Sequence, residues 1–235
     1  MNPSPNNKTN NAKSKEIRSR DLEDHKIEES IHISRALELI NQGKYTDAEK
    51  IYRLLISLNT ENHLVYCNLA ALIGLKGNKN EMVILLKQAL NLYPNFPEAL
   101  CNLGSALKDL GDLEGAIKSF KKAIKVKPNF ADAYYNLGNT FKQKGDFDSS
   151  IICYQEALKY KTIFPEAFSN LGLSLKEKGN INKAISNYKK AIKLKFNYPE
   201  AHNNLGIALK DHGEILKAID CFKKAIAIMP SFSKA

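Results

Sequence analysis

The stretch "NLGSALKDLG", residues 102–111, decides the fold because it recurs. It returns as "NLGNTFKQKG" at 136–145, "NLGLSLKEKG" at 170–179 and "NLGIALKDHG" at 204–213, each copy beginning 34 residues after the previous one. Extended in both directions, this period predicts six repeats, and repetition at such a period is typical of solenoid proteins. We number the repeats 1 to 6; they span residues 29–62, 63–96, 97–130, 131–164, 165–198 and 199–232.

Each repeat has the pattern of two amphipathic helices joined by a tight turn. In repeat 3, "PEALCNLGSALKDLGDLEGAIKSFKKAIKVKPNF", apolar residues recur three and four positions apart on both sides of a Gly-Asp break. A glycine occupies this turn in every repeat, as expected where a helix ends in a left-handed conformation. These glycines are Gly43, Gly77, Gly111, Gly145, Gly179 and Gly213. Pro97, Pro165 and Pro199 stand where a first helix would begin. The pattern predicts an all-α fold.

Small and aromatic residues follow the same period. Small residues would let the two helix backbones of a repeat approach closely. They are Gly104, Gly138, Gly172 and Gly206 in the first helices and Ala116, Ala184 and Ala218 in the second. Met82 and Ser150 replace this alanine in repeats 2 and 4, which argues against equally tight packing there. Aromatic residues that close five repeats are predicted to pack one repeat on the next: Phe96, Phe130, Phe164, Tyr198 and Phe232.

Together these features resemble the tetratricopeptide repeat, and the resemblance covers residues 29–232. It implies a right-handed superhelix whose inner surface is lined by the first helix of every repeat. Repeat 1 departs from the pattern, with Ser34 and Arg35 where the other repeats have asparagine and leucine. We interpret repeat 1 as a degenerate N-terminal cap.

The ends of the chain differ from the repeats. Residues 1–28 are rich in Asn, Ser, Lys and Glu and poor in apolar residues, which predicts a disordered arm. The array is predicted over residues 29–235, because Ser233, Lys234 and Ala235 match the opening of a seventh repeat. We therefore expect a longer parent chain. The uncovered last repeat would also invite self-association.

Two ladders of polar residues run through the first helices. The asparagine ladder consists of Asn68, Asn102, Asn136, Asn170 and Asn204, and the lysine ladder of Lys108, Lys142, Lys176 and Lys210. A carboxamide both donates and accepts, so it can pair with the main chain of a ligand whatever its side chains. Neighbouring helices lie about 10 Å apart and an extended chain advances about 3.3 Å per residue, so each asparagine would serve three ligand residues. The ladders predict binding of an extended peptide, with the lysines favouring acidic or phosphorylated segments.

Both ladders have a structural alternative. The asparagines can bond to the backbone or to their equivalents in the next repeat, and the lysines can form a solvated stripe. Two other kinds of ligand are disfavoured. Acidic residues stand where relatives that bind a terminal carboxylate need lysine or arginine: Glu98, Asp132, Glu166 and Glu200. RNA-reading solenoids vary their base-reading side chains, whereas these asparagines do not vary, so no nucleic acid partner is expected despite a net charge of +10.

The sequence carries no motif for catalysis, cofactor binding or metal binding. It lacks the phosphate-binding, dinucleotide-binding, zinc-protease and nucleophile-elbow patterns. Cys67, Cys101, Cys153 and Cys221 form no C-x-x-C pair, which predicts neither a zinc site nor a disulfide framework. No apolar run is long enough to cross a membrane and no secretory signal is present. These features predict a cytoplasmic protein.

We expect a noncatalytic scaffold for protein–protein interaction that binds extended peptides and needs no cofactor. The alternative is the substrate-recruiting N-terminal region of a larger glycosyltransferase or sulfotransferase. This alternative rests on a resemblance to the repeat region of O-linked N-acetylglucosamine transferase, in which an asparagine ladder holds substrate peptide. The likeness is limited to the five asparagines named above.

Overall fold

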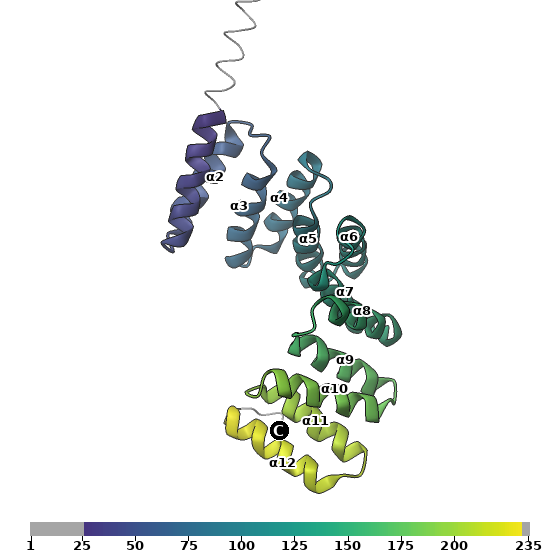
Figure 1. The fold of residues 1–235 in the computed structure, drawn as a ribbon. Coiled ribbons are helices and arrows are strands. Elements are labelled where there is room, and N and C mark those ends of the chain that lie inside the picture. Colours follow the sequence, from purple (N-terminus) through teal and green to yellow (C-terminus); the bar gives the residue numbers. More distant parts are fainter. Residues whose placement is uncertain (1–25, 232–235) are drawn as a thin grey trace, which may run out of the picture. The chain divides into compact units, whose positions relative to one another are not determined.

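The computed structural model describes residues 26–231, and every regular element in this range is a helix (Figure 1). The chain forms two compact units, and the division falls between Tyr93 and Pro94. The N-terminal unit contains a helix over residues 26–41, α2 (Tyr45–Ser57), α3 (His63–Leu75) and α4 (Lys79–Leu92). Two helices per repeat are thus present in repeats 1 and 2, as predicted.

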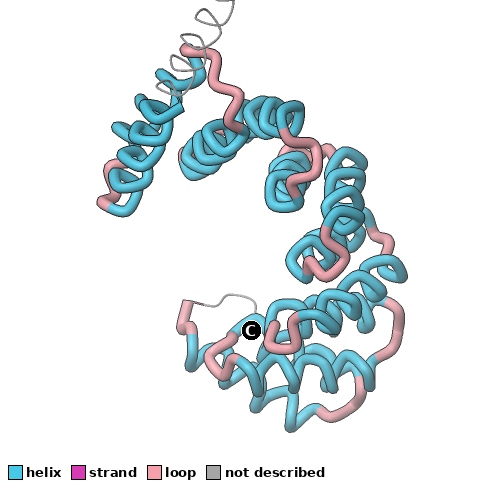
Figure 2. The backbone as a smooth tube through the Cα atoms, turned by 45° about the horizontal axis from the view of Figure 1, so that its top comes forward, coloured by secondary structure: helices cyan, strands magenta, loops and turns pink. Residues whose placement is uncertain are grey.

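The C-terminal unit contains repeats 3 to 6, again with two helices each. These are α5 (Pro97–Asp109), α6 (Leu113–Val126), α7 (Ala131–Lys144), α8 (Phe147–Tyr160), α9 (Pro165–Glu177), α10 (Ile181–Leu194), α11 (Pro199–Asp211) and α12 (Ile215–Ile228). Short loops join consecutive helices (Figure 2). The predicted all-α solenoid of repeats is confirmed.

The helix over residues 26–41 corrects the predicted end of the disordered arm. Residues 26–28 were expected in the arm, but they are helical. Near the start of this helix, Nε2 of His32 lies 3.9 Å from Oε1 of Glu28, one turn away. Residues 1–25 of the expected arm, the closing aromatic Phe232 and residues 233–235 of the expected seventh repeat lie outside the described residues.

The turns inside the repeats follow the glycine pattern. All six turn glycines have positive φ, between 74° and 87°, a conformation that a side chain would penalise. The next helix then begins at a side-chain cap in two of the C-terminal repeats. The carboxylate of Asp112 accepts from the backbone N–H of Gly115 at 2.9 Å, and that of Asp146 from Ser149 at 3.0 Å.

The glycines of the first helices make room for aromatic rings of the second helices. This refines the expectation that they let the two helix backbones approach. A Cβ atom added at Gly104 would lie 2.8 Å from the ring of Phe120, and one at Gly138 would lie 2.7 Å from the ring of Tyr154. Both rings are fully buried. The glycines therefore accommodate an aromatic side chain of the second helix rather than its backbone.

The two replacements of alanine are packed tightly, contrary to expectation. Ser150 is fully buried, and its hydroxyl bonds to that of Ser174 in the next repeat at 2.8 Å. A polar pair that satisfies itself can be buried at little cost. Met82 fills the space beside Gly74, where an added Cβ would lie 2.8 Å from its sulfur.

The apolar face of α12 is uncovered in the described part of the chain. Ile219 is 42% exposed, whereas Ile185, at the same position one repeat earlier, is 7% exposed. The difference arises because α11 packs on α10, while no described helix follows α12. Self-association through this face stays a prediction.

Candidate functional site

The first helices of the C-terminal unit lie along one side of the array. Each contacts the next first helix, α5 with α7, α7 with α9 and α9 with α11. The second helices α6, α8 and α10 pack instead between the first helix of their own repeat and that of the following one. Consecutive first helices are therefore closer together than consecutive second helices are. This places the first helices on the inner side of the curve within this unit.

One face of every first helix in this unit stays open to solvent. It carries the second, sixth, ninth and thirteenth residues of the repeat, which share a helix face at this spacing. We call this surface the inner face. Its residues are Glu98, Asn102, Ser105 and Asp109 in α5; Asp132, Asn136, Asn139 and Gln143 in α7; Glu166, Asn170, Leu173 and Glu177 in α9; and Glu200, Asn204, Ile207 and Asp211 in α11.

The five ladder asparagines do not share one environment. In the N-terminal unit, Nδ2 of Asn68 donates to the hydroxyl of Tyr52 at 3.2 Å. In the C-terminal unit, Asn102 is exposed and Asn204 is partly buried, and neither carboxamide bonds to a residue that the structure describes. Nδ2 of Asn136 makes a weak contact with Sγ of Cys101 at 3.7 Å. Some of these amides are thus open to a ligand, while others are engaged within the chain.

Asn170 is the most engaged of the asparagines. Its Nδ2 donates to the hydroxyl of Tyr135 at 3.1 Å and to Oδ1 of Asn139 at 3.0 Å. Its Oδ1 accepts from Nζ of Lys142 at 2.9 Å. The hydroxyl of Tyr154 donates to the same Oδ1 of Asn139 at 2.8 Å. This network joins repeats 4 and 5, so Asn170 shows the structural alternative that the sequence left open.

The ladder lysines also differ from one another. Nζ of Lys108 lies 3.6 Å from the carboxylate of Asp109, and Nζ of Lys176 lies 3.0 Å from that of Glu177. Lys210 is exposed. Burial, followed by the charge of Lys108, lowers the pKa of Lys142. Two lysines of the ladder are therefore paired with a carboxylate, one is half-buried and one is exposed.

Three of the four acidic residues at the second position, Glu98, Asp132 and Glu166, are paired with lysines that no sequence pattern had singled out. Nζ of Lys127 lies 3.1 Å from the carboxylate of Glu98 and 4.7 Å from the ring centre of Phe130. Lys161 repeats this arrangement with Asp132 and Phe164, at 3.1 Å and 4.2 Å. A lysine three residues before the closing aromatic was the signal for this contact. The closing aromatics thus also attract a cation.

A difference between two buried tyrosines gives a test of the network. Tyr154 and Tyr188 are fully buried at equivalent positions, but only the hydroxyl of Tyr154 has a described partner. We expect Tyr154→Phe to lower the free energy of unfolding by about 0.5–1.5 kcal/mol. Tyr188→Phe should leave it unchanged or raise it, because it removes an unsatisfied buried hydroxyl. Urea unfolding of both variants measures the difference; equal losses would contradict the assignment.

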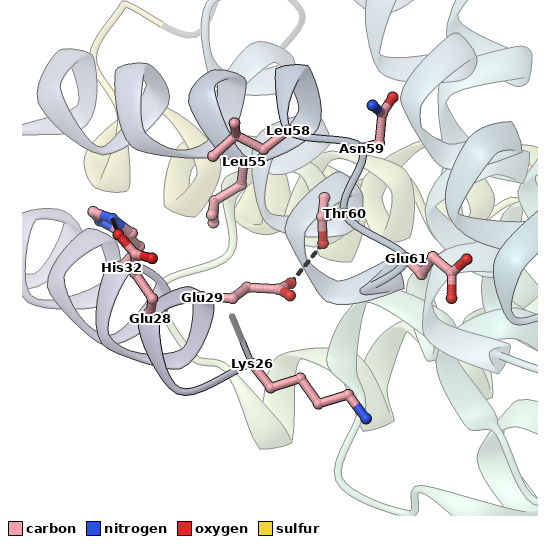
Figure 3. A pocket seen from close by; sticks show the side chains of 9 residues that line it. All are labelled: Lys26, Glu28, Glu29, His32, Leu55, Leu58, Asn59, Thr60 and Glu61. Carbon is pink, nitrogen blue, oxygen red and sulfur yellow. Dashed lines mark hydrogen bonds and ion pairs between the residues drawn. The ribbon is translucent and has the colours of Figure 1, made fainter. Parts of the chain in front are cut away.

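A separate cavity of about 450 Å³ lies in the N-terminal unit (Figure 3). Leu55 and Leu58 line one side, and Glu29 points from the opposite helix toward Thr60, whose hydroxyl donates to its carboxylate at 2.5 Å. The other residues that line it are Lys26, Glu28, His32, Asn59 and Glu61. No ladder residue belongs to this cavity, and no sequence pattern indicated it.

The described residues offer no metal cluster and no activated thiol. They contain no group of three His, Cys, Asp or Glu side chains that could hold a metal ion. Burial raises the pKa of Cys67, Cys101 and Cys153 to about 11, so these thiols stay protonated at neutral pH. Within residues 26–231, no helix has the length and apolar composition that a membrane span requires.

Comparison with protein-family models matches most of the repeat region. A model described as "TPR repeat" matches residues 104–145 and 172–213. Models described as "Tetratricopeptide repeat" match residues 131–161 and 199–232, 85–118, and 30–62. A search of curated protein sequences found no match.

Several solved structures share the fold. A crystal structure of MamA is 30% identical, with a TM-score of 0.64, and the match covers 69% of this chain and 95% of that one. Two others are below 25% identity and show the fold alone. YrrB, described as "a TPR protein with an unusual peptide-binding site", is 21% identical, with a TM-score of 0.65 and coverage of 78% and 94%. PilF of Pseudomonas aeruginosa is 14% identical, with a TM-score of 0.75 and coverage of 88% and 94%.

These comparisons agree with the helix pairs, the turn glycines and the 34-residue period. They do not test the likeness to O-linked N-acetylglucosamine transferase, which stays a prediction. From its repeats, its family matches and its likeness to MamA, the chain belongs to the tetratricopeptide repeat family.

Proposed function

We propose that the C-terminal unit is a protein-interaction scaffold that binds extended peptide segments along its inner face. The observation that carries this proposal is that the carboxamides of Asn102, which is exposed, and Asn204, which is partly buried, have no hydrogen-bond partner in the described chain. An amide placed in this way can pair with both the N–H and the C=O of a ligand main chain. Successive repeats would then hold successive segments of the peptide.

The asparagines divide between two roles in this proposal. Asn102, Asn136 and Asn204 contact the ligand directly, because their amide groups have weak or no contacts within the chain. Asn170 instead fixes α9 against α7 through Tyr135, Asn139 and Lys142. Asn68 belongs to the N-terminal unit, and its role toward a ligand stays a prediction.

The lysine ladder would add a preference for acidic or phosphorylated segments. Lys142 contributes most in this proposal, since its half-buried charge has no carboxylate within ion-pair distance in the described chain. Lys108 and Lys176 contribute less, because each already has an acidic neighbour. Lys210 is exposed, and solvent screens its charge. The peptide-binding site named for YrrB, a protein of this fold, is consistent with a peptide ligand.

The proposal is tested by removing the available amides together. We expect the triple variant Asn102→Ala, Asn136→Ala, Asn204→Ala to bind peptides at least about tenfold more weakly, because several ligand hydrogen bonds are lost at once. The probe is a displayed library of random peptides of about 12 residues, the length that four repeats would span. Individual binders are then measured by fluorescence polarisation.

A matched control replaces exposed asparagines outside the inner face. Asn129→Ala with Asn182→Ala should leave peptide affinity unchanged. Far-ultraviolet circular dichroism confirms that both variants keep their helices. If the parent chain retains no peptide from the library, or if the triple variant binds as the parent does, the proposal is wrong.

A further inference from the structure

The ninth position of the repeat changes its chemistry along the inner face. It is polar in α5 and α7, as Ser105 and Asn139, and apolar in α9 and α11, as Leu173 and Ile207. All four side chains are partly exposed. After this position alone, we call the inner face of repeats 3 and 4 the polar half and that of repeats 5 and 6 the apolar half; the second, sixth and thirteenth positions are polar or charged in both.

Hydrogen bonding shows what the change at Leu173 removes. In α7, Oδ1 of Asn139 accepts from the hydroxyl of Tyr154 and from Nδ2 of Asn170. One repeat later, leucine occupies the place of this acceptor. The hydroxyl of Tyr188 is buried without a partner in the described chain, and the carboxamide of Asn204 has none either. Leu173 therefore gives up two internal hydrogen bonds and presents an apolar side chain to the inner face.

The ladder lysines of α7 and α9 differ in whether a carboxylate is paired with them. In α7, Nζ of Lys142 donates to Oδ1 of Asn170 at 2.9 Å, and no described carboxylate pairs with Lys142. In the apolar half, Lys176 is paired with Glu177 at 3.0 Å. An acidic ligand group could therefore pair with Lys142, whereas Lys176 already has a carboxylate partner.

We propose that the inner face selects extended peptides in which acidic and apolar residues are segregated. The acidic end of the peptide lies beside Lys142 of α7, and apolar side chains contact Leu173 and Ile207. This inference rests on the proposed peptide binding and specifies its ligand. A peptide in the polyproline II conformation advances about 3.1 Å per residue and returns to the same face every third residue. Apolar ligand residues three positions apart would therefore match the repeat spacing of about 10 Å.

The experiment compares two labelled peptides of identical composition. One carries two leucines three residues apart at one end and glutamates at the other; the second carries the same residues interleaved. The segregated peptide should bind the full chain about tenfold more tightly, since only it places leucines on the apolar half. Each peptide is also tested with its sequence reversed, because the proposal does not fix whether the N-terminus or the C-terminus of the peptide lies against α5.

A double variant assigns the preference to the ninth position. Leu173→Asn with Ile207→Asn should abolish the preference, so that the segregated and the interleaved peptide bind this variant with equal affinity. Asparagine is compatible with this position, since Asn139 occupies it in α7. The matched control, Ile163→Asn with Leu194→Asn, changes exposed apolar residues elsewhere, which are 73% and 40% exposed, and should keep the preference.

The outcomes separate this inference from the proposed function. Equal affinity for the segregated and interleaved peptides would overturn the inference and leave peptide binding intact. A preference that survives the double variant would also overturn it. Failure of the chain to bind any of these peptides, together with failure to retain library peptides, would overturn both.

Discussion

Replacing Phe120 with alanine should lower the free energy of unfolding by about 3–5 kcal/mol. The ring of Phe120 in α6 is fully buried and lies against Gly104 of α5, where an added Cβ would approach it to 2.8 Å. When the ring is removed, Gly104 has no side chain that could fill the space it leaves. The substitution therefore leaves a cavity. The free-energy cost of this cavity adds to the cost of burying less apolar surface. Urea unfolding followed by circular dichroism measures the change.

A phenylalanine on the surface provides the control. Phe196 is 69% exposed, so Phe196→Ala should change stability by no more than about 0.5 kcal/mol. Repeat arrays can unfold locally, and amide hydrogen exchange should therefore show the largest loss of protection in α5 and α6. Similar losses in both variants, or no loss of protection in α5 and α6, would contradict the role given to Phe120.

Replacing Gly138 with leucine should lower the free energy of unfolding by about 2–3 kcal/mol. A Cβ at this position would lie 2.7 Å from the ring of Tyr154, which is fully buried and cannot move into solvent. A leucine side chain would force α7 and α8 apart and disturb the network around Asn139. Thermal and urea unfolding measure the effect, and the distance between α7 and α8 can be followed by paired labels.

Alanine at the same position separates the steric effect from helix propensity. Gly138→Ala adds one methyl group but gains about 1 kcal/mol of helix propensity, so we expect a much smaller loss. Repeat 1 provides a precedent, because Ala36 and Tyr52 occupy the equivalent positions and both are fully buried. A leucine variant as stable as the alanine variant would show that the ring is not the obstacle.

The repeat architecture was predictable from the sequence because its signals are local. The 34-residue period, the turn glycines and the prolines at helix starts each act on the backbone within a few residues. The structure agrees with all three: the six glycines have positive φ, and Pro97 begins α5. The end of the arm was less predictable, because residues 26–28 are exposed in the helix over residues 26–41 and show no apolar pattern that would mark its start.

The candidate site was only partly predictable. Helical spacing placed the asparagines on a common face, and this placement holds for the four in the C-terminal unit. The sequence could not show that Asn170 is engaged while Asn102 and Asn204 are not. The partners of Asn170 are 28 to 35 residues away in the chain, and the same residue type at the same repeat position meets different neighbours.

By itself, the sequence determined the number of repeats, the helix–turn–helix form of each and the face that carries the asparagines, because these depend on local backbone preference and helical periodicity. The tertiary structure decided which polar groups are already satisfied. The hydroxyl of Tyr154 donates to Asn139, and that of Tyr188, at the equivalent position one repeat later, has no described partner. Hydrogen-bond partners come from side chains on adjacent helices, so their pairing depends on distances of a few ångströms that a repeating sequence leaves open.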